Sequence, residues 1–142
     1  MLHDYPLLAP LLALTTWTHV MWTWMYATRL PAMRRQNMAL DSNAPRGVQM
    51  AELPAPTRWK ADNYNHLMEQ PTLFYAVALA LALMRDVHPI SVSLAWTYVA
   101  LRVVHSLVQV SKNHIPTRFV VFALSSFVLF ALTARGVWLL GG

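Results

Sequence analysis

The stretch that decides the fold is residues 58–75, which read R-W-K-A-D-N-Y-N-H-L-M-E-Q-P-T-L-F-Y. It opens polar and passes directly into the apolar run A-V-A-L-A-L-A-L-M. At 3.6 residues per turn, a helix here carries a polar stripe made of Arg58, Asp62, His66 and Glu69, with Asn65 beside it. The apolar run predicts insertion into a lipid bilayer, and ionisable residues that enter a bilayer are candidate functional residues.

The composition of the whole chain indicates an integral membrane protein. Of its 142 residues, 56% are hydrophobic and only 12% are charged, with a mean hydropathy of +0.37. A soluble domain carries about 25% charged residues. The length predicts one domain, residues 1–142. The chain has no cysteine, which excludes disulfides, thiolate nucleophiles and cysteine-ligated metals, and its four glycines form no phosphate-cradling loop.

Four transmembrane helices are predicted, at about residues 5–30, 59–84, 90–111 and 117–140. The first has no charge between Asp4 and Arg29, enough residues to cross a core of ~30 Å. We expect a retained span rather than a signal peptide, because the start lacks a basic region and an A-x-A cleavage site. The intervening residues, about 31–57, are rich in proline and predict a long loop.

The distribution of basic residues predicts the orientation. The net charge of +5 does not indicate nucleic-acid binding, because the basic residues cluster at the ends of apolar runs. With the N-terminus outside, the cytoplasmic side holds eight of them, namely Arg29, Arg34, Arg35, Arg46, Arg58, Lys60, Lys112 and Arg118. The opposite side holds only Arg85 and Arg135. By the positive-inside rule, both termini lie outside the cytoplasm and the loop of about 31–57 lies in it.

A second polar stripe lies on the third predicted helix, where Arg102, His105, Gln109 and Lys112 follow at spacings of 3, 4 and 3. Counted from the outer end, Glu69 lies about 22 Å deep and Arg102 about 18 Å deep. A lone charge near the bilayer centre costs ~2.5–3.5 kcal/mol, so we expect Glu69 and Arg102 to face each other.

Two interpretations of these stripes stay open. The pair of charges either fixes helix register alone or belongs to a cavity for a charged ligand. The cavity is favoured because further polar residues converge on the same end, namely Asn65, His66, Gln109, Asn113 and Arg118. A metal site of His66, Glu69 and His105 is a weaker alternative. His19, among tryptophans, is expected to bond within the bundle rather than to ligate haem.

Two sequence blocks resemble a known family. The block at 65–75, N-H-L-M-E-Q-P-T-L-F-Y, preceded by Arg58, resembles the helix-two signature of the MAPEG proteins, membrane-associated proteins in eicosanoid and glutathione metabolism. The block at 95–113, A-W-T-Y-V-A-L-R-V-V-H-S-L-V-Q-V-S-K-N, followed by Arg118, resembles the bacterial branch of that family. With four spans and a long first loop, the resemblance covers nearly the whole chain.

The resemblance implies a left-handed four-helix bundle, assembled as a homotrimer in a bacterial inner membrane. It implies a glutathione-dependent transferase or peroxidase acting on a hydrophobic electrophile, with glutathione bound between subunits near the cytoplasmic side. Glu69 then binds the amino group of glutathione, and Arg58 and Arg118 bind its carboxylates. Arg118 is the candidate for stabilising the thiolate, with Arg29 or Arg34 second. The remaining candidate binding residues are Asn65, His66, Arg102, His105 and Asn113, and no metal is expected.

The chain departs from the family pattern at three positions. His66 stands where the family usually has asparagine, Asp62 lies within the stripe, and Gln109 stands where bacterial relatives often have histidine. The alternative function is a non-catalytic protein whose intersubunit cleft binds membrane lipid or a partner protein. A small four-span exporter is a third hypothesis, which Arg102 disfavours because an exchanging carboxylate must release its proton freely.

Overall fold

The structure is a computed structural model, and it describes residues 4–141. Within that range the chain is helical apart from turns and loops. The helices are α1 (Leu8–Arg35), α2 (Val48–Ala51), α3 (Ala55–Met68), α4 (Pro71–Leu83), α5 (Pro89–Ser111) and α6 (Ile115–Gly141).

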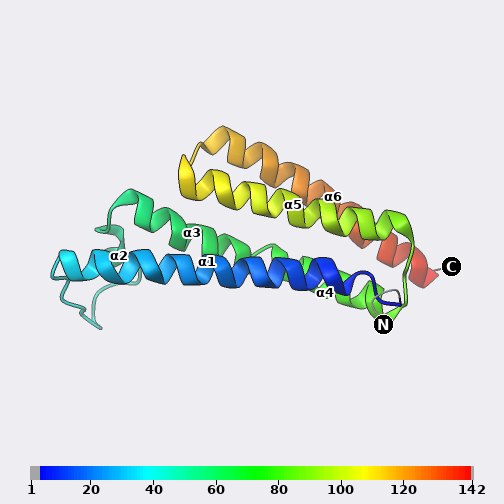
Figure 1. The fold of residues 1–142 in the computed structure, drawn as a ribbon, viewed down its shortest axis with the longest axis horizontal. Coiled ribbons are helices and arrows are strands. Elements are labelled where there is room, and N and C mark those ends of the chain that lie inside the picture. The colour runs from blue at the N-terminus through cyan, green and yellow to red at the C-terminus, as the bar shows by residue number, and fades with distance from the viewer. Residues whose placement is uncertain (1–3, 142) are drawn as a thin grey trace.

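The helices form an elongated bundle of four rods (Figure 1). One rod is α1, a second is α3 followed by α4, and α5 and α6 form the antiparallel third and fourth. Both ends of the described chain lie at the same end of the bundle as the α4–α5 turn, and α2 lies at the other end. This placement puts the predicted loop and the α5–α6 turn together, as the charge count requires.

The loop after α1 is shorter and more structured than the sequence predicted. α1 continues through Pro31 to Arg35, whereas the first helix was expected to end at about residue 30. The side chain of Gln49, in α2, donates to the Ala39 carbonyl at 2.7 Å and accepts from the Asp41 backbone N–H at 3.2 Å. The expected loop of about 31–57 therefore begins later, contains a short helix, and ends where α3 begins at Ala55.

The second rod is broken, so the expectation of one helix over residues 59–84 was wrong. α3 ends at Met68, and Glu69 leaves the helical region with φ −89° and ψ −102°. Pro71 explains the break, because proline has no N–H to donate and its ring excludes the carbonyl of Leu67. The hydroxyl of Thr72 donates to the Glu69 carbonyl at 2.7 Å and restores one lost partner.

Two of the described helices, α5 and α6, are long and apolar enough to cross a membrane. α6 presents large apolar side chains outward, among them Phe127 and Phe130, whose exposed fractions are 73% and 74%. Apolar surface of this extent is unfavourable in contact with water and is typical of a face that contacts a membrane or another protein. α4, with 13 residues, spans a bilayer core only in series with α3.

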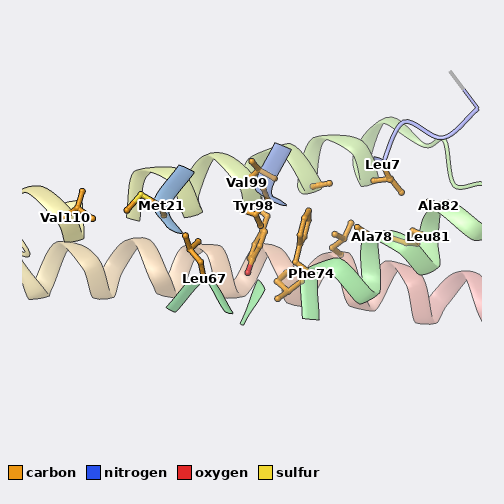
Figure 2. Close-up of a cluster of buried hydrophobic side chains, with 14 residues drawn as sticks. Leu7, Met21, Leu67, Phe74, Ala78, Leu81, Ala82, Tyr98, Val99 and Val110 are labelled. Atoms are coloured by element: carbon orange, nitrogen blue, oxygen red, sulfur yellow. The ribbon is translucent and has the colours of Figure 1, made fainter. Parts of the chain in front are cut away.

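An apolar core runs along the bundle between the rods, from Val110 to Leu81 and Ala82 (Figure 2). The rings of Phe74 and Tyr98 stack there, with centroids 4.6 Å apart and an interplanar angle of 19°. Met21 from α1 and Leu67 from α3 belong to the same buried cluster. This core fixes α5 against α3 and α4, and thereby fixes which side of α5 faces inward in the polar half of the bundle.

A buried carboxylate holds the opposite end together. Asp86, in the α4–α5 turn, accepts from the Ser91 hydroxyl and, at 3.0 Å, from the His88 backbone N–H. Arg135 of α6 lies 3.6 Å from the same carboxylate. Burial acts to raise the pKa of Asp86, but the bonds from Ser91, His88 and Arg135 outweigh it and lower that pKa below its ordinary value. Asp86 therefore ties the turn to α6 as an anion.

Candidate functional site

A cluster of rings and cations fills the space between α3, α5 and α6. The imidazoles of His66 and His105 lie with centroids 5.3 Å apart, and the ring of Phe122 lies 5.8 Å from the first and 6.4 Å from the second. His66 comes from the last turn of α3, and His105 from the inward face of α5. Three helices thus contribute one ring each to this interior cluster.

Arg102 is the most deeply buried cation of the interior cluster, at 1% exposure. Its Nη2 donates to the His66 backbone carbonyl at 3.0 Å, a partner made available as α3 ends. Its guanidinium also lies over the rings of Phe122 and Tyr98, at 5.7 and 5.9 Å. Its Nε and Nη1 have no hydrogen-bond partner among the described residues. The hydrogen bonds of the described residues therefore satisfy this charge only in part.

The expected pairing of Glu69 with Arg102 is not what the structure has. The Glu69 carboxylate lies 3.6 Å from Nδ1 of His66, and its side chain is 67% exposed. The helix break explains this, because Glu69 adopts non-helical angles and turns away from the inward face. Glu69 lies at the exposed edge of the interior cluster, and Arg102 is buried within it.

Arg118 and Asn113 close the cluster at the α5–α6 turn. Asn113 adopts a left-handed backbone, φ 49°, and its side-chain oxygen accepts from Nη1 of Arg118. Nε of Arg118 is buried and without a partner among the described residues. Both Arg118 and Arg102 lie within electrostatic range of His66 and His105. Five sequence-predicted residues are therefore brought together here with Glu69 at their edge, namely His66, Arg102, His105, Asn113 and Arg118.

Sequence reasoning missed two polar residues of the same interior. Asn63 and Ser106 are fully buried, and neither amide atom of Asn63 nor the hydroxyl oxygen of Ser106 has a partner among residues 4–141. Gln109, on the predicted stripe, is buried and leaves its oxygen unpaired. The signal for Asn63 was its spacing of four from Leu67, which places both on the inward face of α3.

Three of the remaining predicted residues line a separate surface pocket of about 450 Å³. Arg29 of α1 and the exposed α3 residues Arg58 and Asn65 line it, together with Arg46 and Asp62. Sequence reasoning did not assign Arg46 to the site. Its neighbour Gly47 has φ 86°, a left-handed angle that turns the loop toward α3. Three guanidinium groups against one carboxylate make this arginine pocket suitable for an anion.

Arg34 does not join either group. It is exposed near the end of α1 and lines a shallow pocket with Trp22, Tyr26 and Leu30. The predicted polar stripe is exposed at Arg58, Asp62, Asn65 and Glu69 and half-buried at His66. Two polar residues outside that stripe, Lys60 and Asn63, are buried, and Nζ of Lys60 donates to the Pro56 carbonyl at 2.8 Å.

The two groups are suited to binding a ligand with several anionic charges. The interior cluster and the arginine pocket both offer guanidinium donors, and charge-assisted bonds from arginine to carboxylates are among the strongest in proteins. Across residues 4–141, no group of three histidine or acidic side chains has the geometry to hold a metal ion. The alternative of a metal site at His66, Glu69 and His105 is therefore not supported.

Comparison with known proteins gives one finding. The family model described as the MAPEG family matches residues 7–138. Among curated proteins and among solved structures, no match to the chain was found. The family match covers the first three rods, α6 as far as residue 138, the interior cluster and the arginine pocket.

Proposed function

The chain belongs to the MAPEG family and is an all-helical membrane protein, and on that premise we propose that it is a glutathione-dependent transferase or peroxidase. Its substrate is a hydrophobic electrophile that reaches the site through the lipid. The observation that carries the proposal is the pair of arginines in the interior cluster, the buried Arg102 and the half-buried Arg118, whose guanidinium groups each keep a buried nitrogen without a partner among the described residues. Both lie within electrostatic range of the imidazoles of His66 and His105. A buried cation with free donors is costly unless an anion completes its contacts.

The proposal assigns each residue a role. Glu69, which is exposed at the edge of the interior cluster, accepts from the amino group of glutathione. Arg118 acts on the sulfur, because an adjacent cation lowers a thiol pKa from ~8.5 and raises the concentration of the nucleophilic thiolate. Arg29, the second candidate for this role, lies in the arginine pocket with Arg58 and Asn65, where the carboxylates of glutathione are suitable ligands.

The exposed stripe of α3 supports a site shared between subunits. Arg58, Asp62, Asn65 and Glu69 face outward from a single chain, and charged residues at bilayer depth face a partner or a water-filled cavity rather than lipid. We propose a homotrimer in which a neighbouring chain covers this stripe and encloses glutathione. In the transferase reaction the thiol proton passes to solvent, a carbon–sulfur bond forms, and the leaving group departs with its electron pair.

The proposed topology has four transmembrane rods, with α2 on the cytoplasmic side of a bacterial inner membrane and both termini outside. Its support is the concentration of basic residues at the α2 end of the bundle. Residues 1–142 then form one domain. The site opens to the compartment that holds glutathione.

Equilibrium binding of glutathione to the purified chain in detergent micelles tests the proposal. We expect saturable binding, weakened about tenfold or more by Glu69→Gln, because a charge-assisted bond is lost. Glu52→Gln is the matched control, since Glu52 is an exposed residue between α2 and α3. Absence of saturable binding, with lipid retained tightly by the chain, would instead favour the alternative, a non-catalytic protein that binds lipid or a partner protein.

A further inference from the structure

A second cavity lies on the outer face of α1, where it passes the break between α3 and α4. It measures about 540 Å³, within the range of sites for small molecules. α1 contributes Thr15, Thr18, His19 and Trp22, α3 contributes Tyr64 and Met68, and α4 contributes Tyr75. None of these residues belongs to the interior cluster or to the arginine pocket, so the cavity is a separate site.

The position of His19 places this cavity near the middle of the bilayer. His19 lies about 16 Å along α1 from Leu8, counted at 1.5 Å per residue, and the hydrocarbon core is ~30 Å thick. Its side chain is exposed on the surface of the chain. An ionisable residue at that depth marks a functional site by default. A molecule that enters here comes from the lipid phase.

The hydrogen bonds around the cavity leave one ring nitrogen of His19 as an acceptor. Nδ1 of His19 lies 2.9 Å from the Thr15 carbonyl, which only accepts, so in the neutral ring Nδ1 carries the hydrogen and Nε2 is an acceptor. Thr18 donates its hydroxyl hydrogen to the Leu14 carbonyl. Tyr75, whose oxygen is 3.4 Å from that hydroxyl, then acts as the donor to Thr18. At His19 the cavity therefore favours a ligand group that donates a hydrogen bond.

The remaining walls of the cavity select a flat, apolar ligand. Trp22, Tyr64 and Tyr75 present aromatic rings, which pair with another ring in stacked or edge-on arrangements. Met68 adds a thioether, which adapts to irregular shapes and contacts aromatic rings favourably. We propose that this cavity binds a lipophilic phenol dissolved in the membrane, with the phenolic hydroxyl donating to Nε2 of His19 and the ring lying among the three aromatic residues.

A comparison of two probes tests this proposal in the full chain, reconstituted in phosphatidylcholine nanodiscs. The probes are para-nonylphenol and its methyl ether, para-nonylanisole, which keeps the shape and loses the donor. We expect saturable binding of the phenol above that of empty nanodiscs, and roughly tenfold weaker binding of the ether. Equal binding of the two probes, or no saturable binding of the phenol, would overturn the proposal.

Variants locate the binding. His19→Phe keeps an aromatic side chain, removes the acceptor, and is expected to reduce phenol binding to the level of the ether. Thr23→Val, on the exposed part of α1 and outside the cavity, is the matched control and should leave binding unchanged. Unchanged binding in His19→Phe contradicts the assignment. Displacement of the phenol by glutathione would also contradict it, because the cavity is separate from the proposed glutathione site.

A second copy of the chain is the competing occupant of this face. The chain has no cysteine, so Trp22→Cys introduces a unique thiol at the cavity. We expect this thiol to react with a lipophilic maleimide in nanodiscs and to be protected by para-nonylphenol. Efficient disulfide formation between two copies would show that a second chain covers the cavity, and would overturn the proposal.

Discussion

At the scale of single residues, the contrast between Arg102 and Glu69 shows how burial decides what a charged residue does. Arg102 is nearly inaccessible and has two nitrogens without a partner among the described residues, whereas the Glu69 side chain is mostly exposed and its carboxylate lies beside His66. An exposed carboxylate exchanges partners at little cost, and a buried guanidinium does not. In the proposed site the Arg102 guanidinium is therefore held in a fixed position, whereas the Glu69 carboxylate can change its partner.

Asp86 offers a prediction that is independent of any ligand. Its pKa is lower in the folded chain than its ordinary value of 3.8, so the carboxylate contributes stability at every pH above that value. We expect Asp86→Asn to lower the free energy of unfolding by about 1.5–3 kcal/mol at neutral pH, because bonds to a charged group are lost. Thermal unfolding in micelles measures the difference.

The pH dependence distinguishes this prediction from a purely steric effect. As pH falls below 3.8 and through the lower folded pKa, wild type loses the contribution of Asp86 and its unfolding temperature should approach that of Asp86→Asn. Asp62→Asn, which changes an exposed residue on α3, is the control and should change stability little. A gap between wild type and Asp86→Asn that stays constant through this range would show that the charge contributes nothing.

At the scale of elements, the break at Glu69 and Gln70 shapes the proposed site. We expect Pro71→Ala to supply an N–H for the Leu67 carbonyl and to join α3 to α4 in one helix. Amide hydrogen exchange at residues 69–72 should then slow about tenfold or more, since the end of α3 no longer frays. Glutathione binding should weaken as well, because Glu69 rotates.

Pro116→Ala is the matched control for this element. Pro116 is the second residue of α6, where the N–H has no partner within the helix, so its replacement creates no new helical bond. Exchange at the start of α6 should therefore change little. If Pro71→Ala also left exchange at residues 69–72 unchanged, the proline would not be the cause of the break.

The positions of the helices could be predicted from the sequence more fully than which side of each helix is buried. Apolar runs and charged ends located the third helix to within a residue, at Pro89–Ser111, and the spacing of Arg102, His105 and Gln109 predicted its inward face. The break before Pro71 was missed, although a proline after a polar stretch signals one.

The inward face of α3 was harder to predict from the sequence, because both sides of this helix carry polar residues. The spacing from Arg58 to Glu69 and that from Lys60 to Asn63 fit a helix equally well. Which side turns inward depends on the packing of Leu67 and Phe74 into the core, and that packing involves residues far along the chain. Asn63 and Ser106 could therefore not be identified as buried polar residues of this interior from the sequence alone, because their burial depends on how α3 and α5 pack.

At the scale of the whole molecule, the absence of cysteine makes the topology directly measurable. Ser42→Cys lies in the loop before α2, and Val87→Cys lies in the α4–α5 turn, both at exposed positions. We expect an impermeant maleimide applied to intact cells to label the second and not the first. Cell lysis should expose both. Labelling of Ser42→Cys in intact cells would reverse the proposed orientation.

The most direct test of the glutathione proposal is an ultraviolet titration of thiolate absorbance at neutral pH. The protein contributes no thiol of its own, and free glutathione is only a few per cent ionised there, so any rise reports thiolate formed on binding. We predict a saturable rise with wild type, its loss in Arg118→Gln, and its retention in Arg35→Gln, which changes an exposed residue at the end of α1. Saturating glutathione without a thiolate signal in wild type would contradict the account.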